Sequence, residues 1–381
     1  GIFPSMGDGG ERTALLGQSS GTKAAETAAC GPATTAAITF IVVTPFFVAL
    51  SLYLTTSLPW RSEQYQSLVA TGGSDADGNL QTTEMLRLPG GRWRSGLALP
   101  CPRRGPLTAH VNGEVLMVGG EPVECTDTLL WAPSAGLWQA LAEQGTAVGQ
   151  QVGGQVVTLR SNTSDLIVTL GGRAIGEADG TAIVAAYSFN ATTREVTGED
   201  TLFGVPIEAM PSARADFGGA AATVGDSQTV LVAGGVAAVG GEPLASVDVL
   251  DVDTGEWATG PTLPVGVSGV AVVAAGDVFF AVGGEAGGGD VLASVARLPA
   301  DLSAPWTAVA NMSMPRAYHG AVFVDGAVEE RRMCVAGGLG ADGEPIASTE
   351  CYIIAEDRWE SKDALASPRA RFAMFVLKQS P

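Results

Sequence analysis

The sequence predicts an all-β fold built from one unit that recurs six times, with four strands in each unit. The clearest copy spans residues 229–257 (TVLVAGGVAAVGGEPLASVDVLDVDTGEW). It contains an apolar strand, a glycine pair, a loop, a second strand and a turn that ends on a tryptophan. A continuous apolar run is typical of a strand buried on both faces. Glycine permits the positive φ and the close backbone approach expected where such a strand leaves the core.

The spacing of the glycine pairs is the second observation. The pairs are Gly72 and Gly73, Gly119 and Gly120, Gly171 and Gly172, Gly234 and Gly235, Gly283 and Gly284, and Gly337 and Gly338. Successive pairs are 47, 52, 63, 49 and 54 residues apart. A period of roughly fifty residues predicts an array of repeated sheets.

A tryptophan follows five of the six pairs after 18 to 22 residues. These are Trp93, Trp138, Trp257, Trp306 and Trp359, and the third unit instead has Tyr187 at an earlier position. An indole supplies a large buried plate, which we expect to lie between neighbouring sheets.

A third pattern precedes most units: a proline followed within three residues by an arginine. It occurs at Pro100 with Arg103, Pro211 with Arg214, Pro315 with Arg316, and Pro368 with Arg369, whereas units three and five lack the arginine. With the glycine pairs and tryptophans, it makes residues 62–378 resemble a kelch-repeat β-propeller. The resemblance implies six blades around an axis, and units three and five are those in which it is least complete.

The chain's end is predicted to complete its first blade. The first strand with a glycine pair has no apolar strand before it inside the domain, because residues 61–64 are short and polar, and residues 372–377 form a strand-like run after the last tryptophan. An open propeller would leave strand edges exposed. We therefore expect residues 372–377 to be the missing strand.

Composition restricts the partners. The chain has 381 residues, 46% of them hydrophobic, and a formal net charge of −19. Nucleic-acid binding depends on Lys and Arg that neutralise phosphates, so this charge argues against a nucleic-acid partner. It fits either a solvated acidic surface or a cationic partner.

The N-terminal region predicts a membrane anchor. We expect a disordered cytosolic tail over residues 1–33 and a transmembrane helix over 34–60, because residues 36–54 are apolar and long enough to span a bilayer. The alternative is a cleaved secretory signal. In the tail, Glu11, Leu15 and Leu16 match an acidic dileucine sorting signal, which implies a vesicle coat adaptor as a cytosolic partner.

Sequons and cysteines place the propeller on the luminal or extracellular side, as in a type II single-pass glycoprotein of the endomembrane system or cell surface. Candidate glycosylation sites are Asn162, Asn190 and Asn311. Candidate disulfides are Cys334–Cys351, across one hairpin, and Cys101–Cys125, in two loops that share a face of the second blade. Two such pairs favour an oxidising compartment; the alternative is four buried free thiols.

We find no catalytic constellation in the sequence. The chain has two histidines, His110 and His319, in separate units, too few to assemble convincingly the copper site of the kelch-like oxidases. No cluster has zinc spacing and no phosphate loop occurs, so we expect neither metal nor cofactor. Glu121, Glu242 and Glu285 follow glycine pairs and are placed either to line one mouth of the ring or simply to face solvent.

The expected function is therefore a non-catalytic, membrane-anchored scaffold whose propeller loops bind a protein or a glycan. One alternative is an enzyme or lectin-like module that acts on carbohydrate. Another is an accessory subunit of a large membrane complex.

Overall fold

The computed structural model describes residues 65–122, 125, 128–132, 137–141, 151–161, 164–326 and 331–379. The chain divides into two compact units, Gly1–Arg61 and Ser62–Pro381, and every described residue belongs to the second. The expected tail, transmembrane helix and dileucine signal (Glu11, Leu15, Leu16) lie outside the described residues. Within the described part, no helix has the length and apolar character of a membrane span.

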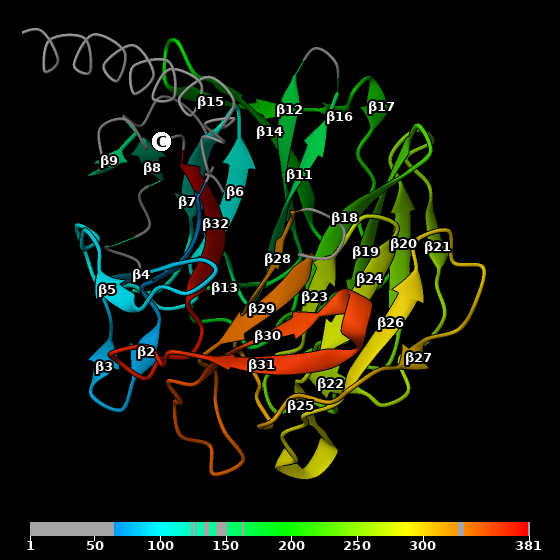
Figure 1. The fold of residues 1–381 in the computed structure, drawn as a ribbon. Helices are drawn as coiled ribbons and strands as arrows, with labels where there is room; N and C mark the ends of the chain where they lie inside the picture. Colours follow the sequence, from blue (N-terminus) through cyan, green and yellow to red (C-terminus); the bar gives the residue numbers. More distant parts are fainter. Residues whose placement is uncertain are drawn as a thin grey trace, which may run out of the picture. The chain divides into compact units, whose positions relative to one another are not determined.

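Six four-stranded antiparallel sheets form the blades of a propeller, as the sequence predicts. In Figure 1, blade 1 lies at the left, blade 3 at the top, blades 4 and 5 at the right and blade 6 at the bottom. From the inner to the outer strand, the blades contain the following strands. Blade 1 has β32 (Ala373–Gln379), β1 (Tyr65–Thr71), β4 (Thr83–Arg87) and β5 (Trp93–Ser95); blade 2 has β6 (Leu107–Val111), β7 (Glu114–Val118), β8 (Leu129–Ala132) and β9 (Leu137–Ala140); blade 3 has β11 (Gln155–Arg160), β12 (Asp165–Leu170), β14 (Val184–Asn190) and β15 (Glu195–Glu199). Blade 4 has β18 (Gly218–Val224), β19 (Ser227–Ala233), β20 (Val247–Asp251) and β21 (Trp257–Thr259); blade 5 has β23 (Ala271–Ala274), β24 (Val278–Val282), β26 (Val295–Pro299) and β27 (Thr307–Ala308); blade 6 has β28 (Gly320–Val324), β29 (Arg332–Ala336), β30 (Thr349–Ile353) and β31 (Arg358–Lys362).

The ring closes because the strands at the two ends of the described chain pair with each other. Strand β32 pairs antiparallel with β1 along its whole length, from Tyr65 opposite Gln379 to Thr71 opposite Ala373. Strand β32 is the red strand left of centre in Figure 1. The prediction that the chain's end supplies the inner strand of blade 1 is confirmed.

The core lies in the layers between neighbouring blades. The second strand of each blade is the most buried; in β19 the side chains of Val230 to Ala233 have no exposed area. Residues of adjacent blades share each apolar cluster, as where Val282 of blade 5 packs with Met333 and Tyr352 of blade 6. This arrangement explains why the second strands read as unbroken apolar runs.

In blades 1, 4, 5 and 6, the fourth-strand tryptophan donates a hydrogen bond to the preceding blade or to the segment that follows it. The indole N–H of Trp306 donates to the carbonyl of Pro261 at 2.8 Å, and that of Trp359 donates to Ala310 at 2.8 Å. In blade 3, Tyr187 on β14 lies opposite Gly198, whereas in blade 6 Tyr352 lies opposite Trp359. The third unit therefore keeps one large ring in this layer although its fourth strand has a glycine in place of tryptophan.

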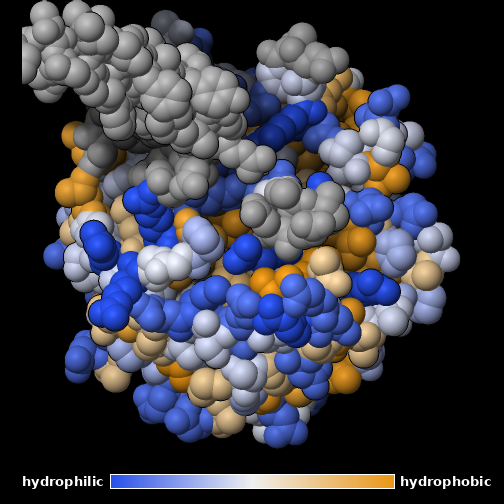
Figure 2. Space-filling model, viewed as in Figure 1, coloured by the Kyte–Doolittle hydropathy of each residue, from blue (hydrophilic) through white to orange (hydrophobic). Residues whose placement is uncertain are grey.

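The surface carries no broad apolar patch on the face shown in Figure 2, where hydrophilic residues predominate and hydrophobic residues form small separate groups. The glycosylation candidates Asn190 and Asn311 are exposed, and Asn162 lies outside the described residues. The Asn190 side-chain oxygen accepts the backbone N–H groups of Thr192 and Thr193, which places this sequon in a tight surface turn.

Candidate binding mouth at the propeller axis

The glycine pairs join neighbouring blades. Both glycines of every pair have positive φ, from 50° at Gly171 to 105° at Gly284. In five blades the N–H of the second glycine donates to a backbone carbonyl at the entry of the next blade. These bonds are Gly73 to Arg103 (2.8 Å), Gly172 to Arg214 (2.9 Å), Gly235 to Val267 (2.8 Å), Gly284 to Arg316 (2.9 Å) and Gly338 to Arg369 (2.8 Å). A Cβ on Gly337 would lie 2.5 Å from the Arg369 carbonyl oxygen, so the joint admits only glycine.

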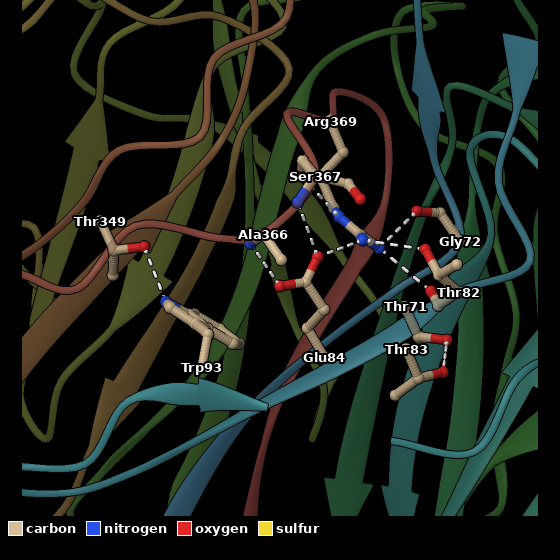
Figure 3. Close-up of polar contacts among 10 residues, drawn as sticks. All are labelled: Thr71, Gly72, Thr82, Thr83, Glu84, Trp93, Thr349, Ala366, Ser367 and Arg369. Carbon is tan, nitrogen blue, oxygen red and sulfur yellow. Dashed lines mark hydrogen bonds and ion pairs between the residues drawn. The ribbon is translucent and has the colours of Figure 1, made fainter. Parts of the chain in front are cut away.

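In blades 1, 4 and 6, the arginine after the proline forms an ion pair within the blade. Arg369 is fully buried, and its guanidinium forms an ion pair with Glu84 at 2.6 Å and donates to the carbonyls of Gly72 and Thr82 (Figure 3). The other carboxylate oxygen of Glu84 accepts the N–H of Ala366 at 2.6 Å. The cluster in Figure 3 therefore ties the chain's last loop to its first blade. A buried carboxylate with this many donors is fully hydrogen-bonded.

Blades 4 and 6 repeat this cluster. Arg214 pairs with Asp248, and Arg316 pairs with Glu350 at 2.8 Å. Burial lowers the pKa of both guanidinium groups, and the adjacent carboxylates oppose that shift. We refer to these arginine–carboxylate pairs, including Arg369–Glu84, as the blade latches. They are structural, because these buried side chains bond to groups within their own blade, although Nε of Arg214 and of Arg316 has no hydrogen-bond partner among the described residues.

The cysteines form the pairs that the sequence predicts. Cys334 and Cys351 lie opposite each other on β29 and β30, with their Cα atoms 4.0 Å apart. The Cα atoms of Cys101 and Cys125 are 5.8 Å apart. Both pairs are at disulfide-bonding distance.

Around the axis, each blade begins with one residue in the left-handed backbone conformation. The six are Gly105 (φ 68°), Gly153 (68°), Asp216 (55°), Gly269 (59°), Tyr318 (54°) and Arg371 (53°). Backbone hydrogen bonds link them in a chain: Gly105 to Arg371, Arg371 to Tyr318, Tyr318 to Gly269, Gly269 to Asp216 and Asp216 to Gly153. We call this the axial ring. It surrounds one end of a cavity of about 290 Å³ along the axis.

Three members of the axial ring carry side chains where glycine would be unstrained. Such strain costs of order 1–3 kcal/mol per residue and is characteristic of functional sites. Arg371 contacts the other two side chains: its guanidinium donates to Asp216 at 2.9 Å and stacks on the Tyr318 ring at 3.5 Å from its centroid. Arg173 reaches the second Asp216 oxygen at 2.9 Å.

The charge of this cluster is positive. Burial acts to raise the pKa of Asp216, but Arg371 and Arg173 outweigh it, so the pKa is lowered and the carboxylate stays ionised. Arg104 lies next to the axial ring and is half-buried. Burial and then the repulsion of Arg371 lower its pKa, and among the described residues no carboxylate lies within ion-pair distance of it. Two guanidinium groups thus share the Asp216 carboxylate, and the third, that of Arg104, has no ion-pair partner among the described residues.

The sequence missed this cluster. It directed attention to Glu121, Glu242 and Glu285, which lie in loops on the same end of the propeller but outside the axial ring. A signal was present: Asp216, Tyr318 and Arg371 each stand two residues after a latch arginine, where blade 2 has Gly105. Among the described residues, no group of three or more His, Cys, Asp or Glu is placed to hold a metal ion.

Comparison with known proteins supports the same fold. No family model matches the chain. It is 38% identical to human Kelch-like protein 34 over 136 residues, covering 33% of this chain and 20% of that protein. It is 29% identical to zebrafish Kelch-like protein 41b over 153 residues, covering 40% and 23%. The chain thus spans about a fifth of the length of these curated relatives.

Among solved structures, the one titled "Structure of YjhT" matches with a TM-score of 0.56 and 16% identity, over 77% of this chain and 97% of that one. At this identity the match shows the fold alone. Together, the Kelch-like similarities and the six blades support a kelch-repeat propeller.

Proposed function

We propose that this chain is a binding scaffold that engages a protein partner at the axial mouth of its propeller. Kelch propellers generally bind proteins. The observation that carries the proposal is the cluster of Arg371, Asp216, Tyr318, Arg173 and Arg104 at the axial cavity. Three of these side chains project from left-handed backbone, and the blade latches and glycine joints hold that backbone rigidly. Rigid, pre-oriented polar groups favour recognition because little conformational entropy is lost on binding.

The protonation states at the cavity favour binding over proton transfer. A general acid or base works best when its pKa lies near the operating pH. The pKa of Asp216 is lowered by its two arginines, and burial lowers the pKa of His319, which also lines the cavity, well below its ordinary value. At neutral pH, the carboxylate is therefore charged and the imidazole is neutral.

Capture of partners from a membrane extract tests the proposal. Full-length wild type is compared with Arg104→Glu, which reverses the charge of the unpaired guanidinium at the mouth. The matched control is Arg94→Glu, the same change at an exposed site on the outer strand β5. We expect at least one protein to be retained by wild type and by Arg94→Glu and to be lost with Arg104→Glu. A set of partners that is the same for all three proteins contradicts a mouth-centred function.

Membrane anchoring belongs to the same proposal. Support comes from the apolar run at residues 36–54, the exposed sequons Asn190 and Asn311, and the two cysteine pairs at bonding distance. These features favour a luminal or extracellular propeller with a cytosolic tail that a coat adaptor binds through Glu11, Leu15 and Leu16. Glycosidase sensitivity of intact vesicles, with and without protease outside, tests this topology. A propeller that is digested from the cytosolic side and carries no glycan contradicts it.

A carbohydrate-directed function is the second candidate. The axial cavity of about 290 Å³ is close to the lower size limit of small-molecule sites, and Tyr318 and Asp216 line it. Binding to a glycan array that is lost with Tyr318→Phe would favour this candidate. Capture of one stoichiometric membrane protein would instead favour an accessory-subunit role.

A further inference from the structure

The charge around the axial mouth is arranged in two zones. The inner zone holds Arg104, Arg173 and Arg371 around Asp216. The outer zone, which we call the acidic rim, consists of carboxylates in the loops that follow the glycine pairs: Asp75, Asp77, Glu121, Glu177, Asp179, Glu242, Glu285, Asp290, Asp342 and Glu344. All ten are exposed or half-buried, and none forms an ion pair with another described residue.

Topology places the acidic rim around the mouth. Each of these loops connects a blade's second strand to its third, on the end of the propeller where the axial ring lies, and runs outward from the glycine pair. Loops of neighbouring blades approach each other; the Glu242 carboxylate of blade 4 lies beside Gly287 of blade 5. Across residues 72–82, 119–128, 171–183, 234–246, 283–294 and 337–348, the single basic residue is Arg173.

The two zones are built mostly from different parts of the repeat; of the inner arginines, Arg173 alone shares a loop with rim acids. The rim acids are in the loops between second and third strands. Two of the inner arginines, Arg104 and Arg371, are in the loops that enter the first strands, and the other basic residues of those entry loops are Arg103 and the latch arginines Arg214, Arg316 and Arg369. The cations that remain accessible on this end are thus gathered at its centre.

We infer that the mouth binds a peptide segment in which one acidic side chain is flanked by lysines or arginines. Guanidinium groups bind carboxylates through charge-assisted, paired hydrogen bonds. Arg104 has no carboxylate partner among the described residues, so its guanidinium can bind one from a ligand. The acidic rim attracts cations and repels a run of acids, and such complementarity governs specificity. The rim spans loops from all six blades, so its charges match an extended ligand better than a small molecule. This inference rests on the proposed function and specifies its ligand.

Three labelled seven-residue peptides test the charge preference against the full chain. The first has a central glutamate with two lysines on each side, the second has glutamine at the centre, and the third has glutamates in place of the lysines. In fluorescence anisotropy at about 50 mM salt, we expect the first to bind on the order of tenfold more tightly than the second and at least tenfold more tightly than the third. Equal binding of the first two peptides, tighter binding of the third, or no binding of any of them overturns the inference.

Two variants assign the preference to the two zones. Arg104→Gln should abolish the difference between the glutamate and glutamine peptides while leaving the attraction of the lysines. Glu285→Gln with Asp290→Asn should weaken the first peptide severalfold and reduce its salt dependence. The control is Glu195→Gln with Asp200→Asn, two exposed acids of blade 3 outside the rim, and it should change nothing. If the control pair weakens the first peptide as much as the rim pair, then only net charge matters and the inference is wrong.

This test is separate from that of the proposed function. If a protein is captured through Arg104 but the peptides show no charge preference, then the mouth is still the binding site, and the inferred charge pattern of its ligand is wrong. Thermal unfolding of each variant, expected to match wild type, shows that a loss of binding does not reflect a loss of folding.

Discussion

Blades 5 and 6 reach the same backbone geometry with opposite chemistry. In blade 6, buried Arg316 pairs with Glu350, whereas in blade 5 the corresponding residues are Val267 and Ala296. The register of the strands shows that Glu350 and Ala296 correspond. Glu350 lies opposite Val335 and Ala296 lies opposite Ala281, and both Val335 and Ala281 stand two residues before a glycine pair. The joint to the preceding blade is unchanged: Gly235 donates to Val267 at 2.8 Å, and Gly284 donates to Arg316 at 2.9 Å.

The comparison separates two functions of the segment that enters each blade. Its backbone carbonyl joins the preceding blade and does not depend on the side chain. Its side chain fastens the blade itself, either with an ion pair or with apolar packing. Replacing a complete buried ion pair with apolar residues is often neutral, whereas removing one partner is costly. This explains why the arginine and the acid are both absent in blade 5.

The largest effect is expected from removing the closure of the ring. Deletion of residues 368–381 takes away β32, which pairs with β1 over seven residues, and Arg369 with its latch. The edge of β1 that paired with β32 is then exposed and the ring is no longer closed by the chain's end, so we expect no cooperative thermal unfolding transition by circular dichroism. A truncated chain that melts like the full-length protein would refute closure by the C-terminal strand.

Removing one partner of a blade latch should destabilise the protein less than deleting β32 does. Replacing both partners of the latch with apolar residues should destabilise it less again. Glu350→Ala leaves a buried guanidinium without its carboxylate, and we expect a loss of about 3–5 kcal/mol in the free energy of unfolding. Arg316→Val with Glu350→Ala copies blade 5 into blade 6 and should recover at least about half of that loss. Urea unfolding of both variants measures it. If the single and the double variant lose the same unfolding free energy, then apolar residues cannot replace the ion pair in blade 6.

A glycine joint should tolerate no side chain in either type of blade. Gly337→Ala places a Cβ 2.5 Å from the Arg369 carbonyl oxygen at φ 60°, and we expect a loss of more than about 2 kcal/mol in unfolding free energy. Gly343→Ala is the control, because its φ is 78° and its Cβ would have no heavy atom within 4 Å. The difference between the two variants measures the close contact apart from the backbone conformation. If both lose the same amount, the contact contributes nothing.

The smallest effect concerns the pH dependence of stability. Burial and the adjacent Arg316 hold the pKa of His319 well below 6.5, and burial lowers that of His110 to about 4. The unfolded chain takes up these protons near pH 6.5 while the folded chain does not. Stability is therefore full above pH 6.5 and falls as the pH decreases toward the folded pKa values, by up to about 1.4 kcal/mol per pH unit for each histidine.

His319→Phe isolates the contribution of His319 to the pH dependence of stability. Phe217 and Phe372 already occupy the corresponding place beside the second glycine of another pair, as His319 does beside Gly338. Neither ring nitrogen of His319 has a hydrogen-bond partner among the described residues, so the variant should be at least as stable as wild type at pH 7. Its unfolding free energy between pH 6.5 and 5 should also fall less steeply. An unchanged slope would show that His319 does not titrate on unfolding.

Much of this fold could be read from the sequence because the repeat is a local pattern. Apolar second strands, glycine pairs and tryptophans recur at regular spacing, and each is required by contacts that every blade makes with its neighbour. The closing strand was predictable as well, because a ring with one missing strand admits only one source for it. The opposition of Cys334 and Cys351 follows from the same hairpin register.

The binding mouth could not be read in this way, because its residues are far apart in the chain. Arg104, Arg173, Asp216, Tyr318 and Arg371 belong to different blades, and although three of them stand two residues after a latch arginine, that spacing does not show that the five side chains meet. Only the closed ring brings the six blade entries around one axis, where backbone amides link them and Arg173 and Arg371 both pair with Asp216. Local periodicity determined the blades, and the meeting of side chains at the axis was decided by tertiary closure.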